Sequence, residues 1–497
     1  MPRYLLVTGA LVVDTVAGAA FAGDILIEGG RIADVRRGPI EVGEHVERHD
    51  AAGQLVMPGL VNAHTHGHGS LGKGLGDLWS LELLLNAAQW ASAGLDYEAC
   101  RVGAMLNAAE MVRKGTTAGY DLFVQIPTPD AGALAAVARG YADVGVRVVL
   151  APMMADRSFY ESVPGLMAAL PEKAAERIRK AASASHADQL AVLRRWLHDW
   201  RFDRDWIRPA LAPTIPTHCT RAFLEGCRDL AHDYDALLQM HLAESKPQAV
   251  AGLEVFGKTL TGHLHELGLL GPRFTGAHCV WLDDDDLSRM ADSGARIAHN
   301  PGSNLRLGCG IAPARRMLDK GIAVGVGTDG SVSSDNQNMF EAMRLASYVS
   351  RATSPDPGDW ISAPEALRMA TVGGAEILGF SDRIGRIAPG CLADLVFLDL
   401  GNLNFVPLND PVRQLVQCED SSSVRSVMIG GRFVLDDGEF VGFDYGALCR
   451  KAQITAERLN ERARDSRRFA ETIEDVVARH CVGLARQPYH VQRYSGC

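Results

Sequence analysis

Residues 58 to 66 read Pro-Gly-Leu-Val-Asn-Ala-His-Thr-His, an apolar run that ends in His64 and His66. Side chains alternate between the two faces of a strand, so these two histidines point the same way and can reach one ion. Metals of the zinc type favour imidazole nitrogen, and a catalytic site leaves one coordination position open for water. The H-x-H spacing alone is weak evidence for a metal.

Three further apolar runs end in the same kinds of side chain. The stretch QMHLAE at 239–244 carries His241 and, just beyond it, Glu244. The stretch GAH at 276–278 ends in His278, and VGTDG at 326–330 carries Asp329. A buried aspartate needs a cation or hydrogen-bond donors nearby. Four histidines and an aspartate at strand ends therefore predict a metal site.

These runs belong to a longer alternation of apolar strands with helical stretches. The strands are expected at 56–62, 116–122, 146–152, 208–213, 237–241, 274–278, 296–299 and 323–328. Eight strand–helix units of this length are typical of a (β/α)₈ barrel of the TIM type, in which the C-terminal strand ends meet at one mouth. An α/β barrel therefore brings the metal-binding side chains together, although open α/β sheets share this periodicity.

Short β-rich segments flank the barrel on both sides. Residues 1–57 and 386–444 contain β-branched runs punctuated by glycine, and we expect them to pair into one small β-sandwich domain. The catalytic barrel is then 58–385, with a two-helix insertion at 156–206 that forms a lid or a packing element. Residues 445–497 form a charged helical tail, expected to be a solvated face.

The composition of the chain limits the classes of partner that can be expected. The chain of 497 residues is 47% hydrophobic and 22% charged, which is ordinary for a globular protein, and its net charge is −10. This balance argues against nucleic acid or an anionic membrane as partner, and no apolar run is long enough to span a bilayer. Ten cysteines without a C-x-x-C pair favour a reducing cytoplasm. The apolar start of the chain is interrupted by Asp14, so no secretory signal is expected.

In these motifs the sequence resembles the ATZ/TRZ and cytosine-deaminase-like branch of the amidohydrolase superfamily, and the resemblance covers nearly its whole length. Besides the metal motifs, the segments AHNPGSNLRL at 298–307 and GTDGS at 327–331, followed by Asp335 and Asn338, resemble that branch. The split β domain fits it too.

The resemblance implies a role for each motif residue. His64, His66, His241 and Asp329 would bind one divalent metal, zinc most often and iron in some members. Glu244 matches the proton-shuttling carboxylate, and His278 matches the histidine that orients the attacking water. A metal of this kind lowers the pKa of its water to roughly 7. The fourth strand lacks the lysine that bridges two metals in binuclear members, so a mononuclear site, which goes mostly with deamination, is expected.

Substrate contacts are harder to place. Trp79, Trp281, Asn304 and Arg306 match positions where this branch contacts substrate, although Trp79 fits a packed core equally well. His218, after the fourth strand, contacts substrate or lies in a surface loop, and His68 is expected in or just behind the pocket. The segment GHGSLGKG at 67–74 nearly matches a phosphate-binding P-loop, but glycine replaces its final Ser or Thr.

The sequence therefore predicts an aminohydrolase that converts an amino-substituted purine, pterin, pyrimidine or triazine to its oxo form and releases ammonia or an amine. Chloride displacement and hydrolysis of an amide or urea bond remain open at the same site. The P-C-x-x-C signature of deaminases acting on nucleic acid is absent, so the partner is a small heterocycle. A non-catalytic scaffold is disfavoured because all four ligands are intact. Relatives often pair, so a homo-oligomer is expected.

Overall fold

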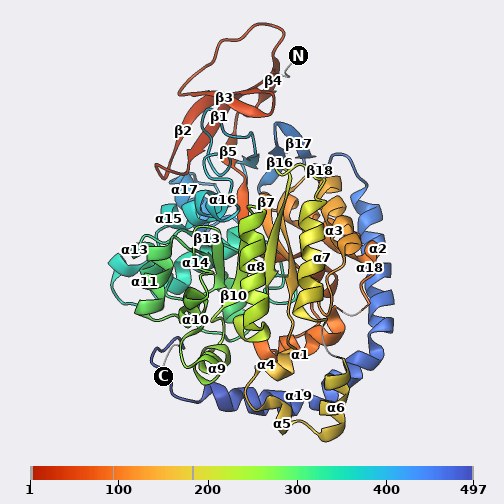
Figure 1. Ribbon diagram of the computed structural model, residues 1–497. Helices are drawn as coiled ribbons and strands as arrows, with labels where there is room; N and C mark the ends of the chain where they lie inside the picture. Colours follow the sequence, from red (N-terminus) through yellow and green to blue (C-terminus); the bar gives the residue numbers. More distant parts are fainter. Residues whose placement is uncertain (1–3, 93, 182–183, 495–497) are drawn as a thin grey trace.

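Parallel strands form a barrel in the centre of the molecule (Figure 1). The computed structural model describes residues 4–92, 94–181 and 184–494. The strands are β6 (Leu60–His66), β7 (Thr116–Val124), β8 (Arg147–Met154), β9 (Ile207–Pro213), β10 (Leu237–Leu242), β11 (Phe274–His278), β12 (Arg296–His299), β13 (Val324–Val326) and β14 (Asp329–Gly330). At the two ends of their order, β13 pairs with β12 and β14 pairs with β6. Because β13 and β14 are two pieces of one strand, the sheet closes, which confirms the (β/α)₈ barrel.

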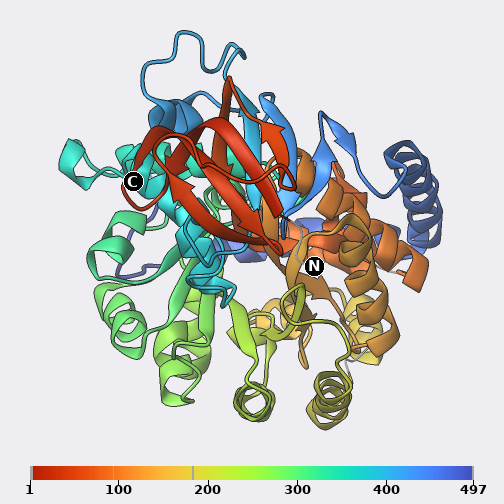
Figure 2. The same cartoon turned by 90° about the horizontal axis from the view of Figure 1, so that it is seen from above.

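Helices surround these strands in a ring, as the view from above shows (Figure 2). Side chains of β7 and β8 are buried on both faces, which explains why these strands read as nearly continuous apolar runs. The surrounding helices are α2 (Tyr97–Arg113), α3 (Ala131–Val144), α7 (His186–His198), α8 (Arg221–Asp233), α9 (Lys246–Phe256), α10 (Leu260–Glu266), α11 (Asp284–Ser293), α12 (Pro301–Arg306), α13 (Ala314–Asp319), α14 (Met339–Arg351), α15 (Ala363–Arg368) and α16 (Gly374–Ile377).

The terminal segments form a second sheet of mixed strand direction. It follows the order β18-β17-β16-β15-β5-β1-β2-β3, with β4 paired to β1. The strands are β1 (Tyr4–Asp14), β2 (Ala19–Glu28), β3 (Arg31–Arg36), β4 (Glu47–Asp50), β5 (Gln54–Pro58), β15 (Leu395–Asp399), β16 (Val424–Ile429), β17 (Arg432–Asp436) and β18 (Glu439–Phe440). β5 pairs antiparallel with β15, so the two ends of the chain meet in one continuous hydrogen-bonded sheet instead of the expected sandwich.

Two helices of the tail wrap the barrel. α18 (Tyr445–Arg462) runs along α2, and α19 (Arg464–Ala485) crosses the end of the barrel opposite the terminal sheet (Figure 1). There α19 contacts α1 (Leu81–Ala91), α5 (Leu166–Ala169) and α9.

The insertion at 156–206 contains α5 together with α4 (Phe159–Ser162) and α6 (Glu172–Lys180). Its apolar side chains pack against α19. The tail is thus half buried rather than a purely solvated face.

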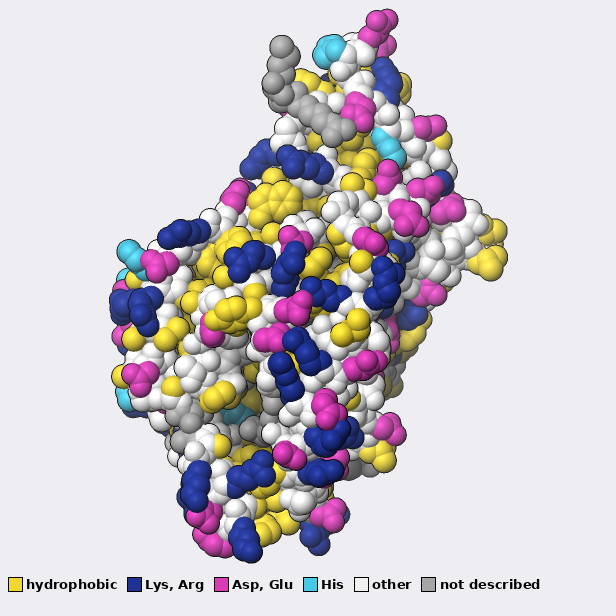
Figure 3. Space-filling view, turned by 90° about the vertical axis from the view of Figure 1, so that its right-hand side faces the viewer, with side chains coloured by type: hydrophobic (Ala, Val, Ile, Leu, Met, Phe, Trp, Pro, Cys, Tyr) yellow, Lys and Arg dark blue, Asp and Glu magenta, His cyan; other side chains and the backbone are white. Residues whose placement is uncertain are grey.

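The outer side of the tail is densely charged, with both signs interspersed (Figure 3). Arg458 and Arg462 pair with Asp96, and Lys451 pairs with Glu98, so these charges tie α18 to the start of α2. None of the described helices has both the length and the apolar character needed to span a membrane.

Candidate metal centre

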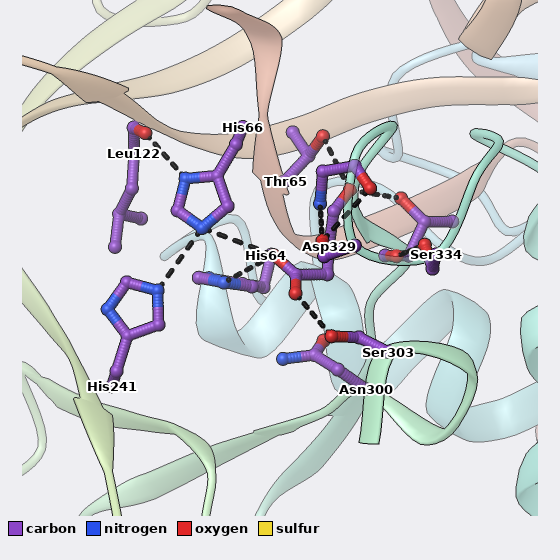
Figure 4. Close-up of polar contacts among 12 residues, drawn as sticks. His64, Thr65, His66, Leu122, His241, Asn300, Ser303, Asp329 and Ser334 are labelled. Atoms are coloured by element: carbon purple, nitrogen blue, oxygen red, sulfur yellow. Dashed lines mark hydrogen bonds and ion pairs between the residues drawn. The ribbon is translucent and has the colours of Figure 1, made fainter. Parts of the chain in front are cut away.

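The histidines of the predicted metal site come together at the C-terminal end of the barrel strands (Figure 4). His66 ends β6 and His64 lies two residues before it, His241 lies one residue before the end of β10, and Asp329 begins β14. Three of these side chains are buried, and His66 is 12% exposed at its side chain. The structure therefore places all four predicted ligands around one point.

Each ring is oriented by a hydrogen bond at Nδ1. In His64, Nδ1 lies 2.6 Å from Oε1 of Gln239. In His66 it lies 2.7 Å from the Leu122 carbonyl, and in His241 it lies 2.9 Å from the Thr214 carbonyl. The Gln239 amide is itself oriented, because its Nε2 donates to the Ala63 carbonyl. All three partners are acceptors, so Nδ1 carries the ring proton and Nε2 presents a lone pair.

The lone pairs converge. The Nε2 atoms of His66 and His241 lie 3.1 Å apart. Oδ1 of Asp329 lies 3.3 Å from Nε2 of His64 and 3.1 Å from Nε2 of His66. Electron-rich atoms this close repel one another unless a cation lies among them, and anchored Nδ1 atoms are typical of metal-binding histidines. The donors therefore fit a divalent metal bound by three nitrogens and one oxygen.

Asp329 is prepared for this position by its surroundings. Ser303 donates to its Oδ2 at 2.6 Å, which leaves Oδ1 facing the histidines (Figure 4). Burial alone would raise the pKa of this carboxyl, but the adjacent His64 and His66 imidazoles hold it well below its usual range. The residue is a carboxylate at neutral pH, as a metal ligand must be.

Glu244 and His278 lie beside the ligands. Oε1 of Glu244 is 3.6 Å from Nδ1 of His278. One potential ligand atom from each of Glu244, His278 and Asp329 lies within 4.8 Å of the other two. Nδ1 of His278 also lies 2.9 Å from Oδ1 of Asn304, which orients the ring. Oε2 of Glu244 is buried and has no hydrogen-bond partner among the described residues, so it is free to exchange a proton with a bound molecule.

The backbone is strained at these positions. Ala243, His278 and Asp329 have φ of 47°, 70° and 62°, in the left-handed region that non-glycine residues rarely adopt. Such conformations cost free energy and persist only where the surrounding structure holds them, and they cluster at functional sites. Here they turn the chain at the strand ends and direct Glu244, His278 and Asp329 toward one place.

Burial sets the protonation of the two flanking groups. Burial first, and then the charge of Asp329, holds the pKa of the Glu244 carboxyl well above its usual range. Burial lowers the pKa of His278 to about 3. A carboxyl that keeps a proton beside a neutral imidazole can deliver that proton during a reaction.

The other predicted contact residues are dispersed. Asn304 is buried against His278, whereas the Arg306 guanidinium pairs with Asp335 and donates to the Asp77 carbonyl. The ring of Trp79 packs edge-on against Trp90.

His218 is buried near Phe159, and burial lowers the pKa of its imidazole to about 3. Trp79, His218 and Arg306 do not line the cavity at the metal centre, which His68 does line.

Sequence reasoning missed three polar residues that support the site. Gln239 holds His64, Ser303 holds Asp329, and Asn300 places its amide nitrogen 3.4 Å from Nε2 of His278. Gln239 could have been found, because it lies two residues before His241 and so shares its face of β10. Ser303 and Asn300 come from the loop and helix after β12, where no periodicity identifies the residue that turns inward.

Comparison with known proteins identifies relatives over nearly the whole chain. The sequence pattern of the Amidohydrolase family matches residues 55–434. A 5′-deoxyadenosine deaminase of Methanothermobacter thermautotrophicus is 34% identical over 456 residues, which cover 92% of this chain and 98% of that protein.

Two solved structures share the fold over nearly all of both chains. An adenosine deaminase from Xanthomonas campestris with bound zinc has a TM-score of 0.80 at 28% identity, covering 92% of this chain and 98% of that one. The atrazine chlorohydrolase from Arthrobacter aurescens, complexed with zinc, has a TM-score of 0.80 at 26% identity, covering 91% of this chain and 100% of that one.

Proposed function

This chain belongs to the amidohydrolase family, and on that premise we propose that it is a metal-dependent aminohydrolase of nitrogen heterocycles. It replaces an amino or alkylamino group on the ring with an oxo group and releases ammonia or an amine. The observation that carries the proposal is the convergence of three Nε2 atoms and Oδ1 of Asp329 beside a buried Glu244. The deaminase names of the relatives support it.

We propose His64, His66, His241 and Asp329 as the metal ligands, and zinc as the metal because two similar structures contain it. A divalent metal supplies a Lewis acid that lowers the pKa of a water to roughly 7 and makes it a nucleophile at neutral pH. His66, His241, Glu244 and Asp329 line the cavity, so a metal held by the four ligands would be accessible to a molecule bound there.

Proton movement falls to this chain's own carboxylates. Replacing an amino group with an oxo group consumes one water, whose two protons must reach the ring nitrogen and the departing nitrogen. Glu244 carries the first proton through its unpartnered Oε2, as acid and base in turn. Asp329 receives the second at the carboxylate that Ser303 orients. His278, whose ring Asn304 holds through Nδ1, presents Nε2 as an acceptor that would orient the attacking water.

The proposal extends to the setting of the enzyme. We propose a cytoplasmic, homo-oligomeric protein acting on a free small molecule. The cysteines support a reducing compartment, because no disulfide joins any pair of them in the described part of the chain.

The test is a release assay on zinc-loaded protein with amino-, alkylamino- and chloro-substituted purines, pterins, pyrimidines and triazines. We expect ammonia or amine release that Glu244→Gln lowers by roughly 10²–10⁴-fold while zinc content stays unchanged. Glu254→Gln is the matched control, because Glu254 is exposed on α9. Chloride release would favour the chlorohydrolase alternative, for which the atrazine chlorohydrolase is the precedent. A protein that binds no metal would refute the proposal.

A further inference from the structure

The cavity at the metal centre is small, and its lining is of two kinds. Its volume is about 110 Å³, below the roughly 300–1,000 Å³ of pockets that hold drug-sized ligands. His66, His241, Glu244 and Asp329 form the charged and metal-binding part of the lining. Much of the apolar part comes from helix α1, which follows the first barrel strand.

One face of α1 supplies this apolar lining. Leu81, Leu84, Leu85 and Ala88 all line the cavity. Their positions i, i+3, i+4 and i+7 lie on a single helical face, so α1 presents an apolar surface to the metal centre. Leu307, the residue that follows α12 in the chain, extends the same surface.

The rest of α1 is fixed in place. Asn86 donates to the Ala470 carbonyl of α19 and accepts from the Tyr160 hydroxyl. Trp90 packs on Ala463 and Ala470 in the tail. An apolar face anchored this way is a preformed wall of the site.

The carboxylate of α1 is engaged away from the cavity. Glu82 is buried and accepts hydrogen bonds from Ser245 at 2.6 Å and from Ser80 at 3.1 Å. Among the described residues that line the cavity, the only carboxylates are Glu244 and Asp329, and no lysine, arginine, asparagine or glutamine is present. The remaining polar lining comes from His68, Ser92, Thr214 and Ser333.

This lining determines which kind of substituent the non-reacting part of the substrate can carry. A ribose carries vicinal hydroxyls, which proteins commonly bind through a carboxylate. Hydroxyls buried against leucine and alanine would lose their water partners without replacement, whereas an alkyl group there is stabilised by leaving water.

Resting on the proposed function, we propose that the substrate is an amino-heterocycle with an apolar alkyl or alkylamino substituent that packs on the Leu81–Leu84–Leu85–Ala88 face of α1, rather than a ribosylated one. This separates the chain in substrate class from relatives named as nucleoside deaminases.

The test uses matched ligands. Each amino-substituted ring (adenine, pyrimidine and triazine) is prepared with a propyl and with a 2,3-dihydroxypropyl substituent, which have the same length and differ by two hydroxyls. On the ring that turns over, we expect kcat/KM to favour propyl by roughly tenfold or more, mainly through KM. Leu84→Asn should bring the ratio toward one. Leu83→Asn is the control: Leu83 packs toward the insertion and tail, so the ratio should persist.

Equal or reversed preference would overturn this inference while leaving the deaminase proposal intact. If no ring of either series reacts, the proposed function fails, and thermal unfolding of zinc-loaded protein with the same ligands decides the inference separately. A rise in Tm with propyl ligands that is absent with their dihydroxypropyl partners would support the apolar wall. Equal shifts, or none, would overturn it.

Discussion

At the scale of single residues, the metal centre depends on groups that do not themselves touch the metal. Gln239 is the clearest case, because its Oε1 fixes the ring proton of His64 on Nδ1 and its Nε2 is anchored on Ala63. Without this acceptor, His64 can rotate or protonate Nε2, and either change removes a ligand. Orienting partners of this kind are worth roughly 10–100-fold in metal affinity.

We therefore expect Gln239→Leu to weaken zinc binding by roughly 10–100-fold, measured by competition with a chelator of known affinity. Gln189→Leu is the matched control, since Gln189 is an equally buried amide on α7 that bonds the Ala155 and Ala184 carbonyls. The control should lower stability but keep zinc affinity. Equal zinc affinity in the two variants would argue against a role for Gln239 in orienting the ligand.

At the scale of elements, the end of the tail holds two loops against the active site. Arg493 donates to the Val280 and Leu282 carbonyls, and its own carbonyl accepts from Ile311. Between these loops, Trp281 donates to the Cys309 carbonyl at 2.7 Å, and Sγ of Cys309 lies 3.9 Å from Oε1 of Glu244. The tail is thus linked to the proton-carrying group through contacts that do not involve the metal ligands.

Arg493→Ala should therefore lower kcat several-fold, with zinc content unchanged and a fall in Tm of a few degrees, as expected for a loss of about 1 kcal/mol. Kinetics on the zinc-loaded variant, beside zinc analysis and thermal unfolding, test this. Arg486→Ala, which removes an exposed arginine of the same segment, should change neither. An Arg493 variant with full kcat would show that the tail serves stability alone.

Asp286 lies buried in the first turn of α11. Burial raises the pKa of this carboxyl from 3.8 to about 6, although Thr259 donates to it. Its pKa is higher in the folded state than in the unfolded state. The stability that it contributes is therefore full below pH 4 and lost as pH rises through about 6.

Asp286→Asn removes that titration. Relative to the variant, the wild type should lose on the order of 2–3 kcal/mol of unfolding free energy between pH 4 and pH 6.5, measured by urea denaturation at each pH. A difference that does not change with pH would contradict the raised pKa.

The strands, the ligand positions and the packing of the helices could not be predicted equally well from the sequence. β11 and β12 have the predicted bounds, and each is a short run that ends at a histidine. The strand ends indicated four histidines and an aspartate as candidate ligands, and the family resemblance then implied which four of these five side chains bind the metal. The wrapping of α19 did not, because an amphipathic helix reveals its apolar face but not its partner. For the same reason Trp79 and Arg306, plausible by position, engage other parts of the chain in the structure.

At the scale of the whole molecule, one buried ion pair joins the barrel to the terminal sheet. Arg147, which begins β8, donates to Asp394 from Nε at 2.7 Å and from a terminal nitrogen at 3.2 Å. Asp394 precedes β15 and also accepts from the Gly430 amide, while the guanidinium stacks on Trp206 at 4.3 Å. Both charged residues are at most 2% exposed, so neither charge has an alternative partner in water.

Removing one member should cost far more than removing both charges. Arg147→Met leaves Asp394 buried and unpaired, and we expect a loss of about 3–5 kcal/mol in unfolding free energy by urea denaturation. The double change Arg147→Met with Asp394→Asn should recover much of that loss, because the remaining amide still accepts from Gly430 without carrying a charge. Arg425→Met breaks the exposed pair with Asp437 and should cost at most about 1 kcal/mol. If the double variant were as unstable as the single one, packing of the arginine on Trp206 rather than its charge would be what holds the two units together.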